Sequence, residues 1–342
     1  MTTYRHKRVL SVQSHVVYGY VGNKAATFPL QCHGFDVDPV NAVQFSNHSG
    51  YPTKGGEKLT PAQLEALCDG LEANGMLGEY THVLTGYIGN AETLKSLAKL
   101  VRKMRAANPE LVVVVDTVMG DNGKLYVPED VMPVYRDVLC PLASVITPNG
   151  FEASLLTGQS LTTLPHIRSS LTQLHAKSIP TIIITSTTLT DFLPPAAISA
   201  NPDDWIYLIA SQPTTQTFFM IPMRKRQAHF TGTGDLFGAL LLANMDVPVK
   251  DTITASQHLK DACLRSVAVM QAVLDETTER QCQREKARNG DVNAAGWSGD
   301  DAQRRAMFLR DHELAIVQCR GLFTGERVVQ TYEWGVLDIS WS

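Results

Sequence analysis

The sequence lacks the features that mark several common classes of protein. No apolar run approaches the roughly 20 residues that a bilayer-spanning helix needs. Thirty Lys and Arg face 34 Asp and Glu, so the chain has no basic footprint for nucleic acid. The six cysteines form no CxxC pair, which argues against a disulfide framework or a paired zinc site. We therefore expect reduced thiols, a cytoplasmic protein, and no nucleic-acid or membrane partner.

The common signatures for nucleotides and catalytic metals are absent as well. The chain has no GxxxxGK[ST] phosphate loop, no GxGxxG after its first expected strand and no HExxH, so the corresponding NTPase, dinucleotide and zinc-protease sites are not indicated. The first residues, MTTYRHKRVLSVQSH, hold basic side chains but no long apolar core. We therefore expect no secretory signal there. The length of 342 residues allows one large domain or two modest ones.

Short β-rich runs alternate with helical stretches along most of the chain. Strands are expected at 7–12, 35–45, 81–87, 110–118, 143–149 and 180–186, and helices at 24–34, 61–75 and 90–108. This alternation predicts an α/β domain with a central, mostly parallel sheet.

The second half of the chain departs from this alternation. A hairpin is predicted at 204–221, then a helix after Asp235 and a long helix over 251–285. The polar, glycine-dotted stretch 284–305 is expected to be a flexible surface insertion. The tail 313–334 is expected to supply closing strands.

The sharpest chemical signal is GTGD, residues Gly232 to Asp235, ahead of an apolar helix. Glycines reach backbone angles closed to other residues, so successive N–H groups can point at one anion at a helix N-terminus. Such amides suit the charge that builds on a phosphoryl group in transfer. A carboxylate beside them can accept a proton from an incoming hydroxyl. The motif favours phosphoryl transfer to an alcohol, and a plain helix cap is the alternative.

Further polar clusters follow expected strands at their carboxyl ends, where open α/β sheets bind ligands. Asp116 and Asp121 lie in DTVMGDNGKLYVPED, and Asn149 and Glu152 lie in ITPNGFEASLLTG. Oxygens of Asp121 and Glu152 suit Mg²⁺ held largely through water and substrate phosphates. Each carboxylate alone is also explained as a solvated cap, but clusters at consecutive strand ends favour one shared site. The loops in 11–26 and 43–52 are expected on its substrate side.

GTGD before an apolar helix is characteristic of the ribokinase-like superfamily. Together with VLSVQSHVVYGYVGNKAATFPLQ, NAVQFSNHSGY, VLTGY, VMGDNGKLYVPED, ITPNGFEASLLTG and IITS, it closely resembles the pyridoxal kinases. The resemblance implies a ribokinase-like three-layer α/β/α sandwich as a single domain over 1–342, usually a homodimer. It also implies ATP-dependent phosphorylation of the 5′-hydroxyl of pyridoxal in vitamin B6 salvage, with pyridoxine and pyridoxamine as further substrates.

The resemblance implies roles for individual residues. Asp235 is similar to the family's base, and Gly232, Thr233 and Gly234 are similar to its anion hole. The implied substrate contacts are Ser14 and Ser49, which are polar, and Val21, Phe45, His48 and Tyr87, which wall the ring. The implied ATP contacts are Asp121, Tyr126, Asn149, Glu152, Thr185, Ser186, Arg226, Ala228 and Thr233.

Two cation sites also follow from the resemblance. Asp121 and Glu152 resemble residues around Mg²⁺. Asp116 and Thr147 match positions tied to a monovalent cation, usually K⁺, with Na⁺ as the alternative.

The chain departs from the family pattern in three places. Thr117 replaces a proline that would stiffen the strand exit, and Thr231 stands where a small apolar residue is expected. The segment 223–229 is unusually basic, which favours a grip on ATP phosphates over a solvated face. Rival functions are a superfamily kinase acting on hydroxymethylpyrimidine, a nucleoside or a sugar, a silent B6- or nucleotide-binding sensor, and a bland α/β scaffold.

Overall fold

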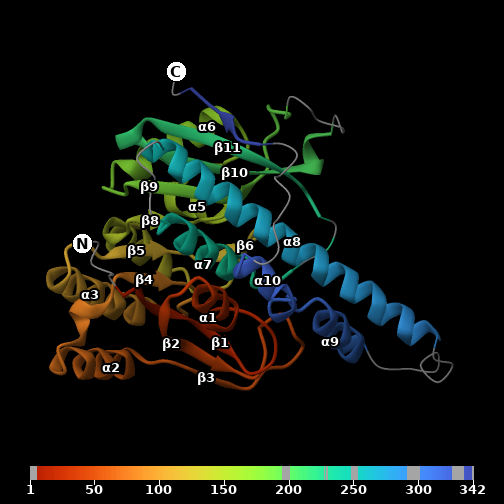
Figure 1. The fold of residues 1–342 in the computed structure, drawn as a ribbon, viewed down its shortest axis with the longest axis horizontal. Helices are drawn as coiled ribbons and strands as arrows, with labels where there is room; N and C mark the ends of the chain where they lie inside the picture. Colours follow the sequence, from red (N-terminus) through yellow and green to blue (C-terminus); the bar gives the residue numbers. More distant parts are fainter. Residues whose placement is uncertain are drawn as a thin grey trace.

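The computed structural model describes residues 6–194, 201–226, 228, 230–247, 253–290, 301–325 and 335–340. Its main sheet has ten strands in the order β12-β11-β10-β9-β8-β5-β4-β1-β2-β3 (Figure 1). The parallel part consists of β1 (Arg8–Val16), β2 (Asp36–Phe45), β4 (His82–Thr85), β5 (Val112–Val115), β8 (Val145–Ile146) and β9 (Thr181–Thr187).

Antiparallel strands complete the two edges of the sheet. They are β3 (Gly56–Lys58), β10 (Trp205–Gln212), β11 (Thr217–Arg224) and β12 (Leu337–Asp338). The predicted hairpin at 204–221 is therefore confirmed as β10 and β11. A separate small ribbon pairs β6 (Gly120–Asp121) with β7 (Lys124–Leu125).

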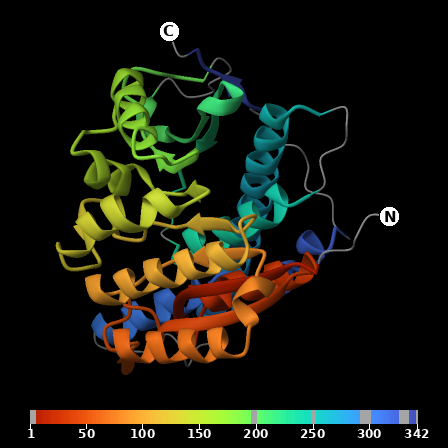
Figure 2. The ribbon, with the colours of Figure 1, turned by 90° about the vertical axis from the view of Figure 1, so that its left-hand side faces the viewer.

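Helices cover both faces of the sheet. One face carries α2 (Pro61–Ala73), α3 (Ala91–Ala107), α4 (Val131–Val134), α5 (Gly150–Thr157) and α6 (Leu164–His175). The other carries α1 (Asn23–Cys32), α7 (Thr233–Met245), α8 (Ala255–Gly290) and α10 (Arg320–Phe323). In Figure 2 the helices of the first face lie to the left and α8 to the right. The predicted three-layer α/β/α sandwich with a mostly parallel sheet is confirmed.

Strand β5 shows how the sequence fixes these layers. Its four valines alternate, because successive side chains of a strand point to opposite faces. Val113 and Val115 pack in the core under α3, whereas Val114 packs in the core under α7. Both faces are buried, which is why the strand reads as an unbroken apolar run.

Two expectations about the second half of the chain need correction. Helix α8 continues to Gly290 and α9 (Asp301–Asp311) begins eleven residues later, so both ends of the expected flexible stretch 284–305 are helical. Residues 291–300 lie outside the described residues. α8 carries many charged side chains, and no helix in the described part of the chain is both long and apolar enough to cross a membrane.

Within its described residues 313–325, the tail expected to supply strands contains two short helical segments and no strand. Val317–Cys319 forms a 3₁₀ turn and α10 follows directly. The edge strand β12 comes later, at Leu337–Asp338. Residues 326–334 of the expected tail strands lie outside the described residues.

A capping box at the start of α2 provides a test of local stability away from the strand ends that carry the site. The Thr60 hydroxyl accepts a hydrogen bond from the Gln63 amide, and the Gln63 side chain accepts one from the Thr60 amide. We predict that Thr60→Ala lowers the free energy of unfolding by about 1 kcal/mol, while Thr60→Ser stays close to wild type. Urea denaturation checks this, and identical midpoints for the Ala and Ser variants would contradict it.

Candidate active site

The N-terminus of α7 is built around Gly232. This residue caps the helix with φ 87°, in the left-handed region that favours glycine. A Cβ added there would lie 2.2 Å from the carbonyl oxygen of Tyr20. Both facts leave glycine as the residue that fits. Thr233 and Gly234 follow in the first turn, where backbone N–H groups lack partners within the helix.

Asp235 lies in the same first turn and is tied to the loop after β1. Its Oδ2 accepts a hydrogen bond from the Gly22 amide at 2.7 Å. A Cβ added to Gly86, just after β4, would lie 3.3 Å from Asp235 Oδ1. Burial raises the pKa of Asp235 above its ordinary value, and the bond from Gly22 opposes that rise in part. The carboxylate is therefore positioned between two loops at the carboxyl edge of the sheet.

Asp116 lies beside this helix terminus at the end of β5. A Cβ added to Gly234 would lie 3.3 Å from Asp116 Oδ2. Thr147, at the end of β8, donates its hydroxyl to Asp116 Oδ1 at 3.3 Å. Burial raises the pKa of Asp116 well above its ordinary range, and the nearby Glu152 and Asp235 raise it further. The structure thus brings together Asp116 and Thr147, the pair expected at the monovalent cation.

Glu152 is both a helix cap and a buried carboxylate. Its Oε2 accepts from the Asn149 amide at 2.9 Å, and Asn149 caps the Glu152 amide in return. Oε1 accepts from the Met119 amide at 2.9 Å. Burial outweighs these bonds and raises the pKa of Glu152 to about 7. Glu152 is therefore a helix cap, but a buried one rather than the solvated cap of the alternative interpretation, and capping does not exclude a functional role.

Asp121 and Tyr126 lie on the small ribbon next to Glu152. The Asp121 carboxylate accepts from the backbone and side chain of Asn122, and Tyr126 is half exposed. The hydroxyl of Tyr87 donates to the Tyr126 carbonyl at 3.4 Å, which links the substrate and ribbon sides. In the described part of the chain, no three His, Cys, Asp or Glu side chains cluster as a metal site. A Mg²⁺ ion here would need oxygen atoms from water or phosphate.

The remaining expected nucleotide residues lie at two places. Thr185 donates its amide to the Pro148 carbonyl at 2.9 Å, and the Ser186 carbonyl lies 3.1 Å from a Cβ added to Gly150, so both adjoin the Asn149 loop. Ala228 is half-buried. The Arg226 guanidinium is held on α8 instead.

Arg226, the expected phosphate contact of the basic segment, contacts α8 in this structure. Its Nε donates to Gln271 Oε1 at 2.9 Å, and its Nη2 lies 2.7 Å from Asp275 Oδ1. Both partners belong to α8. These two contacts pack the 223–226 segment against α8 in this structure.

The expected substrate residues lie near the carboxyl ends of β1, β2 and β4 and in the loops that follow these strands. Ser14 and Val21 are buried, and a Cβ on Gly22 would lie 2.4 Å from the Ser14 hydroxyl oxygen. Lys54 lies over the Phe45 ring, 4.9 Å from its centroid. His48 is buried and Ser49 is exposed.

Sequence reasoning missed three residues that shape this site. Gly22 supplies the amide that holds Asp235. Tyr51 and Glu313 join each other at 3.1 Å although 262 residues separate them. The contact between Tyr51 and Glu313 is visible only in the folded structure, because nothing in the local sequence around Glu313 indicates it.

Comparison with known proteins decides the family. A family model described as phosphomethylpyrimidine kinase matches residues 29–274. A pyridoxal kinase of Arabidopsis thaliana is 45% identical over 276 residues, which cover 80% of this chain and 82% of the relative. One of Bos taurus is 43% identical over 295 residues, covering 83% and 88%. The chain belongs to the pyridoxal kinase family.

A solved structure of the family confirms the ribokinase-like fold. The pyridoxal kinase of Leishmania donovani in complex with ADP and pyridoxine has a TM-score of 0.77 and 32% sequence identity to this chain. The match covers 97% of this chain and 99% of that one. The structural match therefore extends over nearly the whole of both chains.

The buried acids predict an unusual dependence of stability on pH. The pKa of Glu152 in the folded protein, about 7, exceeds its ordinary value of 4.5, so the folded state holds a proton that the unfolded state has lost. The free energy of unfolding should therefore fall as pH rises from about 4.5 to about 7. Urea denaturation in EDTA without nucleotide measures this.

The control separates Glu152 from the other acids. Glu152→Gln should flatten this pH dependence, whereas Glu92→Gln, at an exposed salt bridge on α3, should leave it unchanged. Equal slopes for wild type and Glu152→Gln would contradict the assignment.

Gly232 gives a second test of the site. Gly232→Ala would force a side chain into the left-handed region and against the Tyr20 carbonyl, so we predict at least about a 100-fold loss of kcat through misplacement of the helix terminus. Gly238→Ala is the matched control in α7, because its nearest neighbour would be Leu84 at an ordinary 3.5 Å. Steady-state kinetics compare the two variants, and equal activity would contradict the prediction.

Proposed function

We propose that this chain is a pyridoxal kinase, which transfers the γ-phosphoryl group of ATP to the 5′-hydroxyl of pyridoxal. Pyridoxine and pyridoxamine are further substrates, and pyridoxal 5′-phosphate is formed for vitamin B6 salvage. The observation that carries the proposal is the juxtaposition of Asp235 with the Gly232–Gly234 amides at one helix terminus. A base for an alcohol and an anion hole for a phosphoryl group lie within one turn.

Asp235 acts as the general base in this proposal. It accepts the proton of the 5′-hydroxyl as that oxygen attacks phosphorus. Burial raises its pKa, which makes the ionised form a stronger base than an exposed aspartate. The Gly22 amide at 2.7 Å holds Oδ2 and leaves Oδ1 toward the Gly86 loop. We assign Oδ1 as the proton acceptor.

In this proposal the backbone N–H groups of residues 232–234 stabilise the negative charge that develops on the phosphoryl group. Amides at a helix N-terminus are already oriented, so they need no reorganisation as charge builds. The loops that carry Ser14, Val21, His48 and the other ring contacts orient the alcohol for an in-line approach. Retention of a base argues against a silent sensor, since binding alone needs no proton acceptor.

Cations complete the proposal, because the buried acids fit them. Asp121 and Glu152 would hold Mg²⁺, with Glu152 acting through water since its two oxygens already accept backbone amides. Mg²⁺ supplies charge neutralisation to the ATP phosphates. Asp116 and Thr147 would hold K⁺ or Na⁺, since the Asp116 carboxyl group is buried next to Glu152 and Asp235 and its pKa is raised by burial and by these neighbours.

Tyr126, Asn149, Thr185, Ser186, Ala228 and Thr233 are proposed to contact ATP. All but Ala228 and Thr233 lie around the ribbon and the Asn149 loop, and Thr233 lies at the start of α7. Arg226 is also proposed to contact ATP, although its guanidinium bonds Gln271 of α8 in this structure. We also propose a homodimer in the cytoplasm, as in the family resemblance.

Asp235→Ala tests the proposed role of this carboxylate. Loss of a general base should lower kcat by on the order of 10²–10⁴, while nucleotide affinity changes little because Asp235 is assigned to the alcohol. Pyridoxal-dependent ADP release and equilibrium binding of ADP measure the two effects. Near-normal turnover in this variant would refute the assignment, and lost ADP binding would point to a damaged fold.

A further inference from the structure

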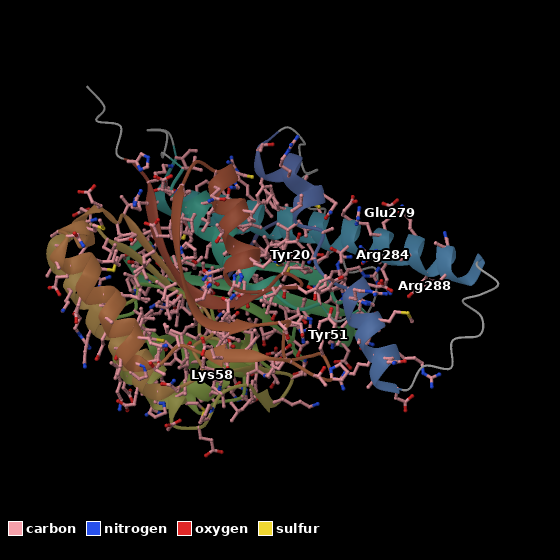
Figure 3. The ribbon with its side chains drawn as sticks, turned by 90° about the horizontal axis from the view of Figure 1, so that it is seen from below. Tyr20, Tyr51, Lys58, Glu279, Arg284 and Arg288 are labelled. Carbon is pink, nitrogen blue, oxygen red and sulfur yellow. The ribbon has the colours of Figure 1, made fainter. Side chains whose placement is uncertain are left out.

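One carboxylate from the C-terminal part of the chain reaches the two substrate loops. Glu313 Oε2 accepts the Tyr20 amide at 2.8 Å. Its Oε1 accepts the Tyr51 hydroxyl at 3.1 Å and lies 3.4 Å from His48 Nε2. Tyr20 follows β1 and Tyr51 follows β2, so a single side chain joins both loops. Figure 3 shows Tyr20 and Tyr51 on the side of the molecule where α8 and α9 lie.

The approach is close and largely shielded from water. The Glu313 side chain is 9% exposed and the His48 side chain is 7% exposed. A Cβ added to Gly19 would lie 2.3 Å from both Glu313 carboxylate oxygens, so the loop after β1 packs directly on the carboxylate. A buried carboxylate without partners is costly, and here three donors from the two loops offset that cost.

The hydrogen bonds of His48 fix its tautomer. The Gly50 amide donates to Nδ1 at 3.1 Å, so Nδ1 carries no proton and the ring proton is on Nε2. That proton faces Glu313. The ring of Tyr51 packs edge-on against the imidazole at 4.7 Å between centroids. Both nitrogens of His48 are occupied, which leaves its ring carbons for contact with a substrate.

Glu313 is itself held by the end of the long helix α8. Asp311, at the end of α9, is buried and pairs with Arg284 at 3.7 Å and with Arg288. Figure 3 shows both arginines along α8 beside α9. The Ala315 amide donates to the hydroxyl of Thr277 at 3.0 Å. We call residues 277–290 and 301–316 the C-terminal arm. Contacts on both sides of Glu313 thus anchor its backbone.

We propose that Glu313 is a positioning residue for the acceptor alcohol, and that the C-terminal arm affects affinity for that substrate only through this one carboxylate. Its carboxylate holds the loops after β1 and β2 in one arrangement, and through them His48 and Val21. The inference rests on the proposed function insofar as these loops bind the alcohol. Within the described part of the chain, none of the contacts of Glu313 is with the residues proposed to bind ATP, so we expect its effect to be confined to one substrate.

Glu313→Ala tests the proposal in the full chain. It removes the common acceptor and leaves the Tyr51 hydroxyl and the His48 Nε2 proton without their partner. We expect the KM for pyridoxal to rise about 10-fold, while the KM for ATP stays within about 2-fold. Glu313→Gln keeps the length and one acceptor oxygen, so it should recover most of the loss. Glu279→Ala, at an exposed glutamate of α8 bonded to Gln283, is the matched control and should match wild type.

Hydrogen exchange provides a readout that does not depend on activity. Amides in 17–22 and 46–51 should exchange faster in Glu313→Ala than in wild type or Glu279→Ala. If Glu313→Ala does not fold, Tyr51→Phe replaces it, since it removes one donor alone; about a 2- to 3-fold rise in the KM for pyridoxal and faster exchange in 46–51 are expected.

The outcomes separate this proposal from the proposed function. An unchanged KM for pyridoxal, or an equal rise in the KM for ATP, would overturn the positioning role. Failure of the wild-type chain to phosphorylate pyridoxal would refute the proposed function alone. In that case hydrogen exchange tests the positioning role by itself. Unchanged protection of both loops in Glu313→Ala would overturn that role, and faster exchange in both loops would support it.

Discussion

Burial of three carboxyl groups at one edge of the sheet is the constraint on which the site depends. Asp116, Glu152 and Asp235 each have a raised pKa, and burial is the largest cause for all three. None of them forms a salt bridge with a Lys, Arg or His in the described part of the chain. Because no positively charged side chain balances these carboxyl groups, their burial destabilises the folded protein. This lack of positive charge suits the cation sites proposed above.

The rest of the fold holds these groups in place. Parallel strands deliver Asp116 and Thr147 to one edge, and α7 begins there because Gly232 permits a backbone that other residues resist. The Gly22 amide then fixes Asp235 across 213 positions of sequence. Glu313 holds a substrate loop in the same way, except that its carboxylate accepts the hydrogen bond from a loop amide. Rigid elements carry the loops, and single hydrogen bonds set their final positions.

The sequence predicts those parts whose causes are local. Alternation of apolar runs predicts the α/β sandwich, and the capping residues Thr60 and Asn149 begin helices as expected. GTGD predicts a helix terminus with an acid in its first turn, because glycine tolerates the positive φ that the turn before such a helix requires. Long-range contacts are beyond such reasoning. The contacts of Arg226 with Gln271 and Asp275 of α8 are an example, because nothing in the sequence around Arg226 indicates them. The composition of 284–290 is that of a linker, yet these residues belong to α8, and Arg288 pairs with Asp311 of α9.

The most direct measurement of the central claim is ADP release by the wild-type chain with ATP and Mg²⁺, in the presence of pyridoxal, hydroxymethylpyrimidine, a nucleoside or no alcohol. A base buried beside an anion hole in this family predicts ADP release that depends on pyridoxal and yields one pyridoxal 5′-phosphate per ADP. Turnover on hydroxymethylpyrimidine or a nucleoside with none on pyridoxal would contradict the account of the substrate loops. Binding of pyridoxal without any ADP release would contradict the account of Asp235 as a base.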